Sequence, residues 1–547
     1  MTRSTLEFAA QACGSAPSEV SPAIVEHLRR REAYKERPSK VEVKETHISW
    51  VFLTDRFAYK LKKPVRFDFL DFSTPEARRL ACEAELRLNA RLARSAYLRV
   101  LPITSSADGK FALDGRGTPV DWVVKMRRLP DDQMLDGLIR RETLSAAQVD
   151  ELADFLARFY HGLSPLTTET RAYRQMLEAH VRANRSELLG EVHALPSALT
   201  KRVHAAQLRS LLVESEQFEG RVCDGRIVEG HGDLRPEHIC LEAPPVIFDC
   251  IEFNAEFRRL DAADELAFLA MECDRLGSDW VGQRIIDAYR RQTGDRFSET
   301  LWNFYKCYRA CVRAKVAALR TAEGVANGEN PGEPPSSNAI EYLSLADRYA
   351  ARLGPPAAIV VTGLMGSGKT TLAEALAESL GAELIQTDRE RRELFGASTA
   401  PAKFEEGVYR PENRRLVYEQ VFRRAEQALS EGLSVILDGA FLTAEQRRRA
   451  WQIAETAGAI PLVARCVCPP EVARERLTQR LAKGAALSEA RADLYDLQSA
   501  RLEPDAPGFV SLEIDTTYGR GQQIASITAK LRRLLAPHLR PEREFKV

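Results

Sequence analysis

The chain has 547 residues, of which 44% are hydrophobic and 29% are charged. A chain of this length is expected to form about two to four domains. Its composition argues against wholesale disorder. Lys plus Arg and Asp plus Glu both number 78, so the net charge is zero, whereas a protein built mainly to bind nucleic acid usually carries a basic excess. No stretch approaches about 18 consecutive apolar residues, and the ten cysteines lack zinc-site spacing. We expect a cytoplasmic protein with free thiols, no membrane segment and no nucleic-acid partner.

The first part of the chain begins with residues that alternate between apolar and polar side chains. The alternation covers residues 41–45, 48–53 and 57–62, with short turns between them, and predicts an antiparallel meander of strands. A helix is expected to begin near Ser73–Glu76, where Pro suits the first turn and Ser or Thr can cap it. A helical pattern also extends from Asp132 to about residue 220.

The clearest break in composition lies at residues 322–338. This stretch is rich in Gly, Pro, Asn and Ser and has no apolar periodicity, so it predicts a loop or linker. A helix predicted over residues 340–353 follows it. We therefore expect one domain over residues 1–321, a linker with a connecting helix over 322–356, and a second domain over 357–547.

A nucleotide-binding motif begins at Gly363. The sequence Gly363-Leu-Met-Gly-Ser-Gly-Lys369-Thr370 follows an apolar strand predicted over residues 357–362 and precedes a helix predicted over 371–380, which is the context that a P-loop requires. Glycines let backbone N–H groups wrap phosphates, the lysine neutralises the β- and γ-phosphates, and the threonine hydroxyl can bind Mg²⁺. The residues expected to bind ATP are Gly363, Gly366, Ser367, Gly368, Lys369, Thr370 and Thr371.

Two acids follow the strands predicted over residues 382–386 and 434–438. Ligands of open parallel sheets collect at the carboxyl ends of the strands. Asp388 is therefore placed to accept a proton from an attacking hydroxyl or to orient it, and Asp438 is placed to hold magnesium together with Thr370. Asp388 could also cap a helix predicted over residues 389–395, and both roles are compatible.

An arginine-rich helix is predicted over residues 470–480. Arg476 and Arg480 are four residues apart and therefore share one helical face. They could close over the phosphates and stabilise charge in a transition state. The alternative is an exposed surface helix laced with salt bridges.

These features resemble the small P-loop kinases, a broad group that includes gluconate kinase, polynucleotide 5′-kinases and zeta-type toxins. The resemblance covers roughly residues 357–510. It implies a catalytic or substrate-orienting role for Asp388, a Walker B role for Asp438 and a lid role for Arg476 and Arg480. The chain has no N-K-x-D motif for reading guanine, which favours a kinase over a GTPase.

The most informative stretch of the first part lies between Val228 and Glu252. It contains His231-Gly-Asp233 in a predicted loop, and later a hydrophobic strand that ends in Asp249. Two acids on such a hairpin-like unit can meet at one site. One can act as a base on a hydroxyl while the other holds magnesium.

This stretch resembles the aminoglycoside phosphotransferase-like kinases, relatives of the protein kinases, whose loop reads H-G-D-x-x-x-x-N before a strand that ends in a magnesium-binding Asp. The resemblance spans about residues 40–320. It implies that Asp233 is the catalytic base, that Asp249 binds magnesium and that His231 is a structural residue of the loop.

The same resemblance assigns the strand meander to the small lobe of a kinase. Lys60 would contact the nucleotide phosphates, and Glu85 would be its partner on the following helix, with Glu83 as the other candidate. Residues 126–129 would form the hinge near the adenine.

Two departures from this family pattern stand out. His238 replaces the loop Asn that would be a second magnesium ligand, and histidine matches Mg²⁺ less well than an oxygen ligand does. The small lobe also lacks a Gly-rich phosphate loop, because the segment at that turn is Lys44-Glu-Thr-His-Ile-Ser49.

We therefore expect a two-domain chain. The N-terminal domain would be α+β, bilobal and protein-kinase-like, and the C-terminal domain an α/β P-loop domain with a parallel sheet. The expected function is a bifunctional ATP-dependent phosphotransferase that uses Mg²⁺ and transfers the γ-phosphoryl group to hydroxyls of small molecules.

Two alternatives remain open. In the first, the P-loop domain is a nucleotide switch or kinase, and the N-terminal domain is a regulatory, pseudokinase-like domain. In the second, the C-terminal domain phosphorylates a nucleic-acid end or a nucleotide-sugar. A basic patch near Lys403 or Arg414–Arg415 would favour this second alternative, and the neutral net charge counts against it.

Overall fold

The chain crosses three times between two compact units. Unit 1 consists of Met1–Thr170 and Gly220–Ser298, and unit 2 of Arg171–Glu219 and Glu299–Val547. The computed structural model describes residues 22–67, 69–326, 337–396, 410–482, 495–505 and 508–539, without the side chains of residues 323–326 and 480–482.

Unit 1 begins with an antiparallel sheet of six strands in the order β1-β2-β3-β8-β6-β7. The predicted meander forms the first three strands. Tyr59 and Leu61 of β3 enter an apolar cluster with α1. Because side chains alternate along a strand, Lys60 and Lys62 share the opposite face, on which α2 packs. The elements are β1 (Glu42–Glu45), β2 (Ser49–Leu53), β3 (Phe57–Lys62), β4 (Arg66–Phe67), β5 (Leu70–Asp71), β6 (Tyr97–Ser105), β7 (Phe111–Leu113), β8 (Thr118–Arg127), α1 (Pro22–Leu28) and α2 (Pro75–Asn89).

The rest of unit 1 is mainly helical. Helix α4 packs on α9, and α9 packs on α8. Two short antiparallel strand pairs, β9 with β12 and β10 with β11, hold the loops between these helices. The loop with Asp233 joins β9 to β10, and Asp249 follows β11. The elements are α3 (Leu135–Arg140), α4 (Ala146–His161), α8 (Ala262–Arg275), α9 (Asp279–Thr293), β9 (Ile227–Glu229), β10 (Ile239–Cys240), β11 (Val246–Ile247) and β12 (Arg259–Asp261).

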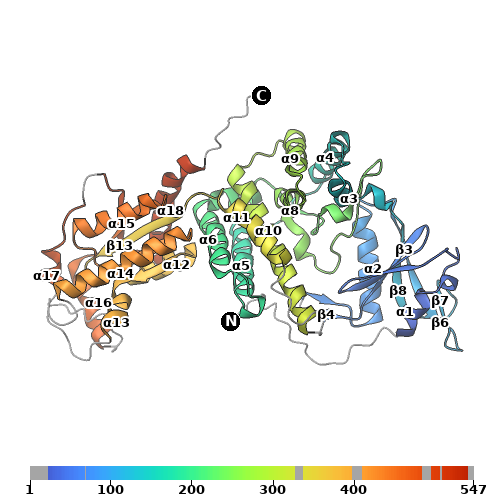
Figure 1. The fold of residues 1–547 in the computed structure, drawn as a ribbon, viewed down its shortest axis with the longest axis horizontal. Helices are drawn as coiled ribbons and strands as arrows, with labels where there is room; N and C mark the ends of the chain where they lie inside the picture. Colours follow the sequence, from blue (N-terminus) through green and yellow to red (C-terminus); the bar gives the residue numbers. More distant parts are fainter. Residues whose placement is uncertain are drawn as a thin grey trace. The chain divides into compact units, whose positions relative to one another are not determined.

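Unit 2 contains a parallel sheet of five strands in the order β14-β15-β13-β16-β17. Helices α12, α14, α15 and α18 surround the central strand β13 (Figure 1), every residue of which is buried. The elements are β13 (Ala357–Gly363), β14 (Glu383–Gln386), β15 (Val435–Asp438), β16 (Ile460–Val467), β17 (Ser511–Asp515), α12 (Lys369–Leu380), α13 (Thr387–Phe395), α14 (Pro411–Ser430), α15 (Ala444–Thr456), α16 (Pro470–Ala482), α17 (Tyr495–Ser499) and α18 (Arg520–Leu535).

The two faces of this sheet have separate apolar cores. Val360 and its neighbours in alternate positions pack against α14 and α15. Ile359 and Val361 pack on the other face against α12 and α18. A near-continuous apolar strand that is buried on both faces is typical of parallel sheets, so the expected α/β P-loop domain is confirmed.

A helix from the first half of the chain completes these cores. Ala205 of α6 belongs to the core with α14 and α15, and Val213 belongs to the core with α12 and α18. Arg532 of α18 donates to the carbonyl of Val213 at 2.6 Å. Helix α6 packs with α10 and α11 in the same unit. These helices are α5 (Thr170–Leu188), α6 (Ser197–Val213), α10 (Glu299–Ala326) and α11 (Ser337–Ala350), and α7 (Ser215–Cys223) leads back to unit 1.

The compact units therefore divide the chain at other points than residues 321 and 356. Helices α5, α6 and α10 fall in the first domain predicted from the sequence, whereas the structure groups them with the P-loop. Apolar periodicity shows that one face of a helix is covered, but it does not show which element covers it. The ranges 1–321, 322–356 and 357–547 remain a prediction about domains that fold separately.

The cysteines that the structure describes are all free thiols. Among the described residues, no helix combines the length and the apolar character that crossing a membrane requires.

The packing of α6 can be tested at Leu208. Its side chain is 1% exposed, and its Cδ1 would lie only 2.9 Å from a Cβ at Gly381, the C-cap of α12. We expect Leu208→Ala to destabilise the P-loop sheet by about 2–5 kcal/mol, measured as loss of hydrogen-exchange protection in β13. Val192, which is 74% exposed, provides the control: Val192→Ala should change stability by less than about 0.5 kcal/mol. Unchanged protection of β13 in Leu208→Ala would show that α6 is not part of this core.

Candidate functional site

The P-loop joins the carboxyl end of β13 to α12. Gly363, Gly366 and Gly368 have φ angles of 140°, 76° and 86°, which only glycine adopts readily. Space imposes the same requirement: a Cβ at Gly363 would lie 2.4 Å from the carbonyl oxygen of Cys466, and one at Gly366 would lie 2.5 Å from that of Ala473. The loop is thus fixed by its own backbone angles and by its contacts with β16 and α16.

The other residues of the motif stand at the start of α12. Lys369 Nζ donates to the carbonyl of Leu364 at 2.8 Å, so the lysine side chain reaches back across the loop. Thr370 forms a side-chain hydrogen bond with Asp438. Ser367 is buried, whereas Thr371 is exposed.

Asp438 ends β15, the strand that pairs with β13. Its side chain is 5% exposed and accepts a hydrogen bond from Gln386 Nε2 at 3.2 Å. Burial raises the pKa of Asp438, while Lys369 and the hydrogen bonds from Thr370 and Gln386 act in the opposite direction. The structure therefore brings the predicted Walker B acid, the P-loop lysine and the P-loop threonine together.

Asp388 lies in the first turn of α13. It pairs with Arg391 on the same helix, and its negative charge acts on Asp438. The alternative reading of Asp388 as a helix cap is wrong, because α13 begins at Thr387 and has Gln386 in the cap position. The carboxylate of Asp388 is paired but partly exposed, and it remains compatible with the predicted role on a hydroxyl.

Arg476 has a different setting from the one expected for a lid residue. Its guanidinium donates to Thr516 Oγ1 at 3.0 Å and to the carbonyl of Thr516 at 2.9 Å, and lies 3.5 Å from the carbonyl of Gly366. It thus fastens α16 to the P-loop and to the end of β17. Arg480 belongs to α16, but its side chain lies outside the described residues, as does Lys403, so the lid role remains a prediction.

Sequence reasoning missed one contact of the P-loop. The side-chain oxygen of Gln498 in α17 accepts a hydrogen bond from the backbone N–H of Met365 at 2.6 Å. No motif marks Gln498, because α17 is short and lies far from the P-loop in the sequence.

The centre of unit 1 is a chain of ion pairs on the helix-covered face of the sheet. Lys60 Nζ lies 2.9 Å from Glu85 and 2.6 Å from Asp249. Burial by itself would lower the pKa of Lys60, but Asp249 and Glu85 raise it well above its usual value. The structure pairs Lys60 with Glu85 of α2, as the resemblance implies, whereas Glu83 pairs with Arg79.

Asp233 and His238 lie close to Asp249. His238 is 3.6 Å from the carboxylate of Asp249 through Nε2 and 3.6 Å from that of Asp233 through Nδ1. His238 Nδ1 also lies 2.9 Å from the carbonyl of Asp233. A carbonyl only accepts hydrogen bonds, so Nδ1 carries the proton and Nε2 presents a lone pair.

Arg235 is a cation in contact with the predicted base, Asp233. Its Nη2 lies 3.0 Å from Asp233 Oδ2 and 3.0 Å from His238 Nε2, and its Nε lies 2.9 Å from Asp233 Oδ1. Arg235 therefore holds the Asp233 carboxylate in one orientation. Sequence reasoning missed Arg235, although its place two residues after Asp233 could have marked it as a partner of that carboxylate.

The loop that carries Asp233 is held by hydrogen bonds to a glutamate of α8. Glu265 is fully buried and accepts hydrogen bonds from the backbone N–H groups of His231, at 2.8 Å, and Gly232. Tyr160 donates to the same carboxylate at 2.6 Å. His231 Nε2 contacts the carbonyl of Phe248 at 2.9 Å, a contact that fits the structural role implied by the resemblance. Sequence reasoning missed Glu265, because a helical glutamate carries no such signal.

Both centres offer donors that suit Mg²⁺ and ATP. In unit 2 the donors are the oxygens of Thr370 and Asp438, and in unit 1 the oxygen of Asp249. His238 Nε2, a weaker match to Mg²⁺, would first have to give up its contact with Arg235 Nη2. Among the described residues, no group of three or more His, Cys, Asp or Glu side chains could hold a metal ion by itself. A Mg²⁺ ion at either centre would therefore share its ligands between the protein and nucleotide phosphates.

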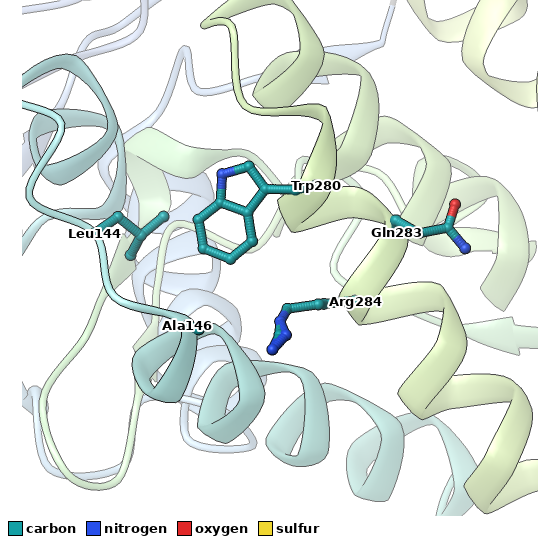
Figure 2. Close-up of a pocket in the computed structure, with 5 residues that line it drawn as sticks. All are labelled: Leu144, Ala146, Trp280, Gln283 and Arg284. Carbon is teal, nitrogen blue, oxygen red and sulfur yellow. The ribbon is translucent and has the colours of Figure 1, made fainter.

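A surface pocket lies elsewhere in unit 1, beside the start of α4 and the first turns of α9 (Figure 2). Leu144, Ala146, Trp280, Gln283 and Arg284 line it. The guanidinium of Arg284 lies 3.3 Å from the exposed Asp150. No predicted site residue lines this pocket, so we assign it no part in either centre.

Replacement of Asp438 should separate stability from metal binding. Because burial raises its pKa, ionised Asp438 costs folding free energy at every pH above the unfolded value of about 3.9. We expect Asp438→Asn to be at least as stable as the wild type at pH 7, with the difference vanishing below that value. The affinity for Mg²⁺·ATP should fall about 10–100-fold, with metal-free ATP affinity unchanged, in calorimetric titrations.

The exposed Glu374 of α12 provides the matched control. Glu374→Gln should alter neither quantity. A loss of stability in Asp438→Asn at pH 7 would contradict this account of Asp438.

Comparisons with known proteins match both parts of the chain. The model of the family described as AAA domain matches residues 359–504. A shikimate kinase of Caldicellulosiruptor bescii is 40% identical over 83 residues, which cover 15% of this chain and 47% of that enzyme. The crystal structure of a choline/ethanolamine kinase family protein from Mesorhizobium loti covers 60% of this chain and 95% of its own, with 13% identity and a TM-score of 0.36.

A longer match extends over most of the chain. The uncharacterized protein Rv2004c of Mycobacterium tuberculosis is 32% identical over 467 residues, which cover 84% of this chain and 90% of that protein. A protein of Mycobacterium bovis, Mb2027c, matches to the same extent. The chain belongs to the family of these mycobacterial proteins.

Proposed function

We propose that this protein is an ATP-dependent kinase with two phosphotransfer centres, one in each unit, and that each centre transfers the γ-phosphoryl group to a hydroxyl of a small molecule. One observation carries the proposal. Lys60 bridges Glu85 and Asp249, two acids far apart in the sequence, beside Asp233. That arrangement supplies a phosphate-binding cation, a metal-binding acid and a base within one unit that has no P-loop.

In unit 1, Asp233 is the base that takes the proton from the acceptor hydroxyl. Arg235 holds this carboxylate in place, and Glu265 fixes the loop that carries it. Lys60 turns from Asp249 towards the phosphates, while the ion pair with Glu85 keeps the ammonium group of Lys60 in the site. Bound Mg²⁺ supplies charge neutralisation for the transferring phosphoryl group, and Asp249 would hold it.

In unit 2, the P-loop backbone and Lys369 bind the phosphates, and Thr370 with Asp438 would hold Mg²⁺. Asp388 orients the acceptor hydroxyl. The match to the AAA domain model lies over these residues, and the partial match to a shikimate kinase supports a kinase. The ion pair with Arg391 holds the Asp388 side chain at the start of α13.

The two centres can be separated by substitutions in the full chain. In transfer assays with labelled ATP and a panel of sugars, nucleosides and aminoglycosides, we expect Lys369→Ala and Asp233→Asn to lower transfer to different acceptors. Each loss should be about 10²-fold or more, because each change removes either a phosphate ligand or a general base. The activity that depends on the other unit should be unchanged.

Two exposed or half-exposed residues serve as controls, Lys530→Ala in unit 2 and Asp224→Asn in unit 1. Neither should alter transfer. Loss of all transfer in Lys369→Ala with none in Asp233→Asn would instead support a single P-loop kinase with a regulatory N-terminal unit. Phosphorylation of nucleic-acid ends by the wild type would replace the small-molecule acceptor in unit 2.

A further inference from the structure

A second lysine of β3 lies deeper than Lys60. The side chain of Lys62 is 0% exposed and its ammonium group lies 2.6 Å from Glu85. It also pairs with Glu252, whose side chain is 4% exposed. The ion pairs thus run without a break from Asp249 through Lys60, Glu85 and Lys62 to Glu252. Both ends of this chain of charges lie in one short segment of unit 1, residues 249–252.

Two further contacts tie the same segment to the sheet and α2. The backbone N–H of Asp249 donates to the hydroxyl of Tyr97 in β6 at 3.2 Å. The backbone N–H of Cys250 donates to the side-chain oxygen of Asn89 in α2 at 3.0 Å. Asp249 needs this support, because its φ angle of 65° lies in the left-handed region that a non-glycine residue rarely adopts.

The two lysines differ in what nucleotide binding would require of them. Lys60 and the 40% exposed Asp249 face the centre, so phosphates and a cation would separate that pair. Lys62 and Glu252 are buried, and a solvent-inaccessible pair of opposite charges is expensive to break because each charge would be left unpaired. The inner pair is therefore the one that persists through a catalytic cycle.

We propose that Lys62 and Glu252 are positioning residues that form a fixed clamp. The clamp keeps residues 249–252 docked on the sheet while Lys60 and Asp249 part to receive the phosphates and the metal. This inference rests on the proposed kinase function of unit 1. It assigns Lys62 no contact with nucleotide, although Lys62 lies on the same face of β3 as Lys60.

The clamp predicts a selective defect. The test uses the full chain with Lys369→Ala, which removes nucleotide binding by unit 2, and adds Lys62→Met with Glu252→Gln. The paired change leaves neither member of the inner pair as a lone buried charge, and Glu85, which loses Lys62, keeps Lys60 as its partner. Exchange of the backbone N–H groups of residues 249–252 should increase at least about tenfold. The affinity for Mn²⁺·ADP should fall about 10–100-fold, while metal-free ADP affinity stays within about twofold, since Lys60 is retained.

Three variants sharpen the test. Lys60→Met should lower affinity for ADP both with and without Mn²⁺. Lys62→Arg keeps the positive charge, so this variant should retain most of the gain in ADP affinity that Mn²⁺ gives before Lys62 is changed. Lys63→Met removes the neighbouring pair with Glu45, which is 56% exposed, and should change nothing.

Unchanged exchange in the double variant would overturn the clamp, as would equal losses of ADP affinity with and without Mn²⁺, which indicate general disruption. If the Lys369→Ala chain binds no ADP at all, the kinase function proposed for unit 1 fails. The exchange measurement then still decides whether Lys62 and Glu252 hold the segment.

Discussion

The shared position of Lys60 between Glu85 and Asp249 is the interaction on which the centre of unit 1 depends. Charges withdrawn from water are stable only when they are paired and hydrogen-bonded. Here β3 and α2 each contribute to the pairs, and the segment after β11 contributes both terminal acids. The pairing therefore fixes the distance between these elements. The cluster holds two ammonium groups and three carboxylates, so its charge favours the approach of a further cation.

The pKa values of the two predicted metal-binding acids are shifted in opposite directions. Lys60 and His238 overcome the effect of burial and hold the pKa of Asp249 well below its usual value. At Asp438 burial dominates and raises the pKa, despite Lys369 and the hydrogen bonds from Thr370 and Gln386. Asp249 is thus ionised and already paired, whereas ionised Asp438 is under-compensated. A cation at unit 2 would relieve a cost that exists before it binds, whereas at unit 1 it would replace an ion pair.

Local patterns predicted the elements and the residues at their ends. The meander with Lys60, the helix with Glu85, the P-loop and the strand that ends in Asp438 were each predictable from the sequence, because alternation, caps and glycine positions are local signals. Sequence patterns did not predict the roles of four other residues, Lys62, Glu252, Glu265 and Gln498. Their partners lie on elements distant in the sequence, and a buried lysine or glutamate looks like a surface residue until the element that covers it is known. The compact units divide the chain at other points than the predicted domain boundaries for the same reason.

The position of α6 explains why the two units occur in one chain. The P-loop cores include Ala205 and Val213, which precede the P-loop by well over a hundred residues. The chain must therefore leave unit 1, contribute this helix to unit 2, return, and leave again. A single cut cannot separate two such units without removing part of one core. The mycobacterial relative matches 467 residues, which is more than either unit contains, so it too spans both. Because of this interleaved connectivity, unit 2 folds completely only when it is part of the same chain as unit 1.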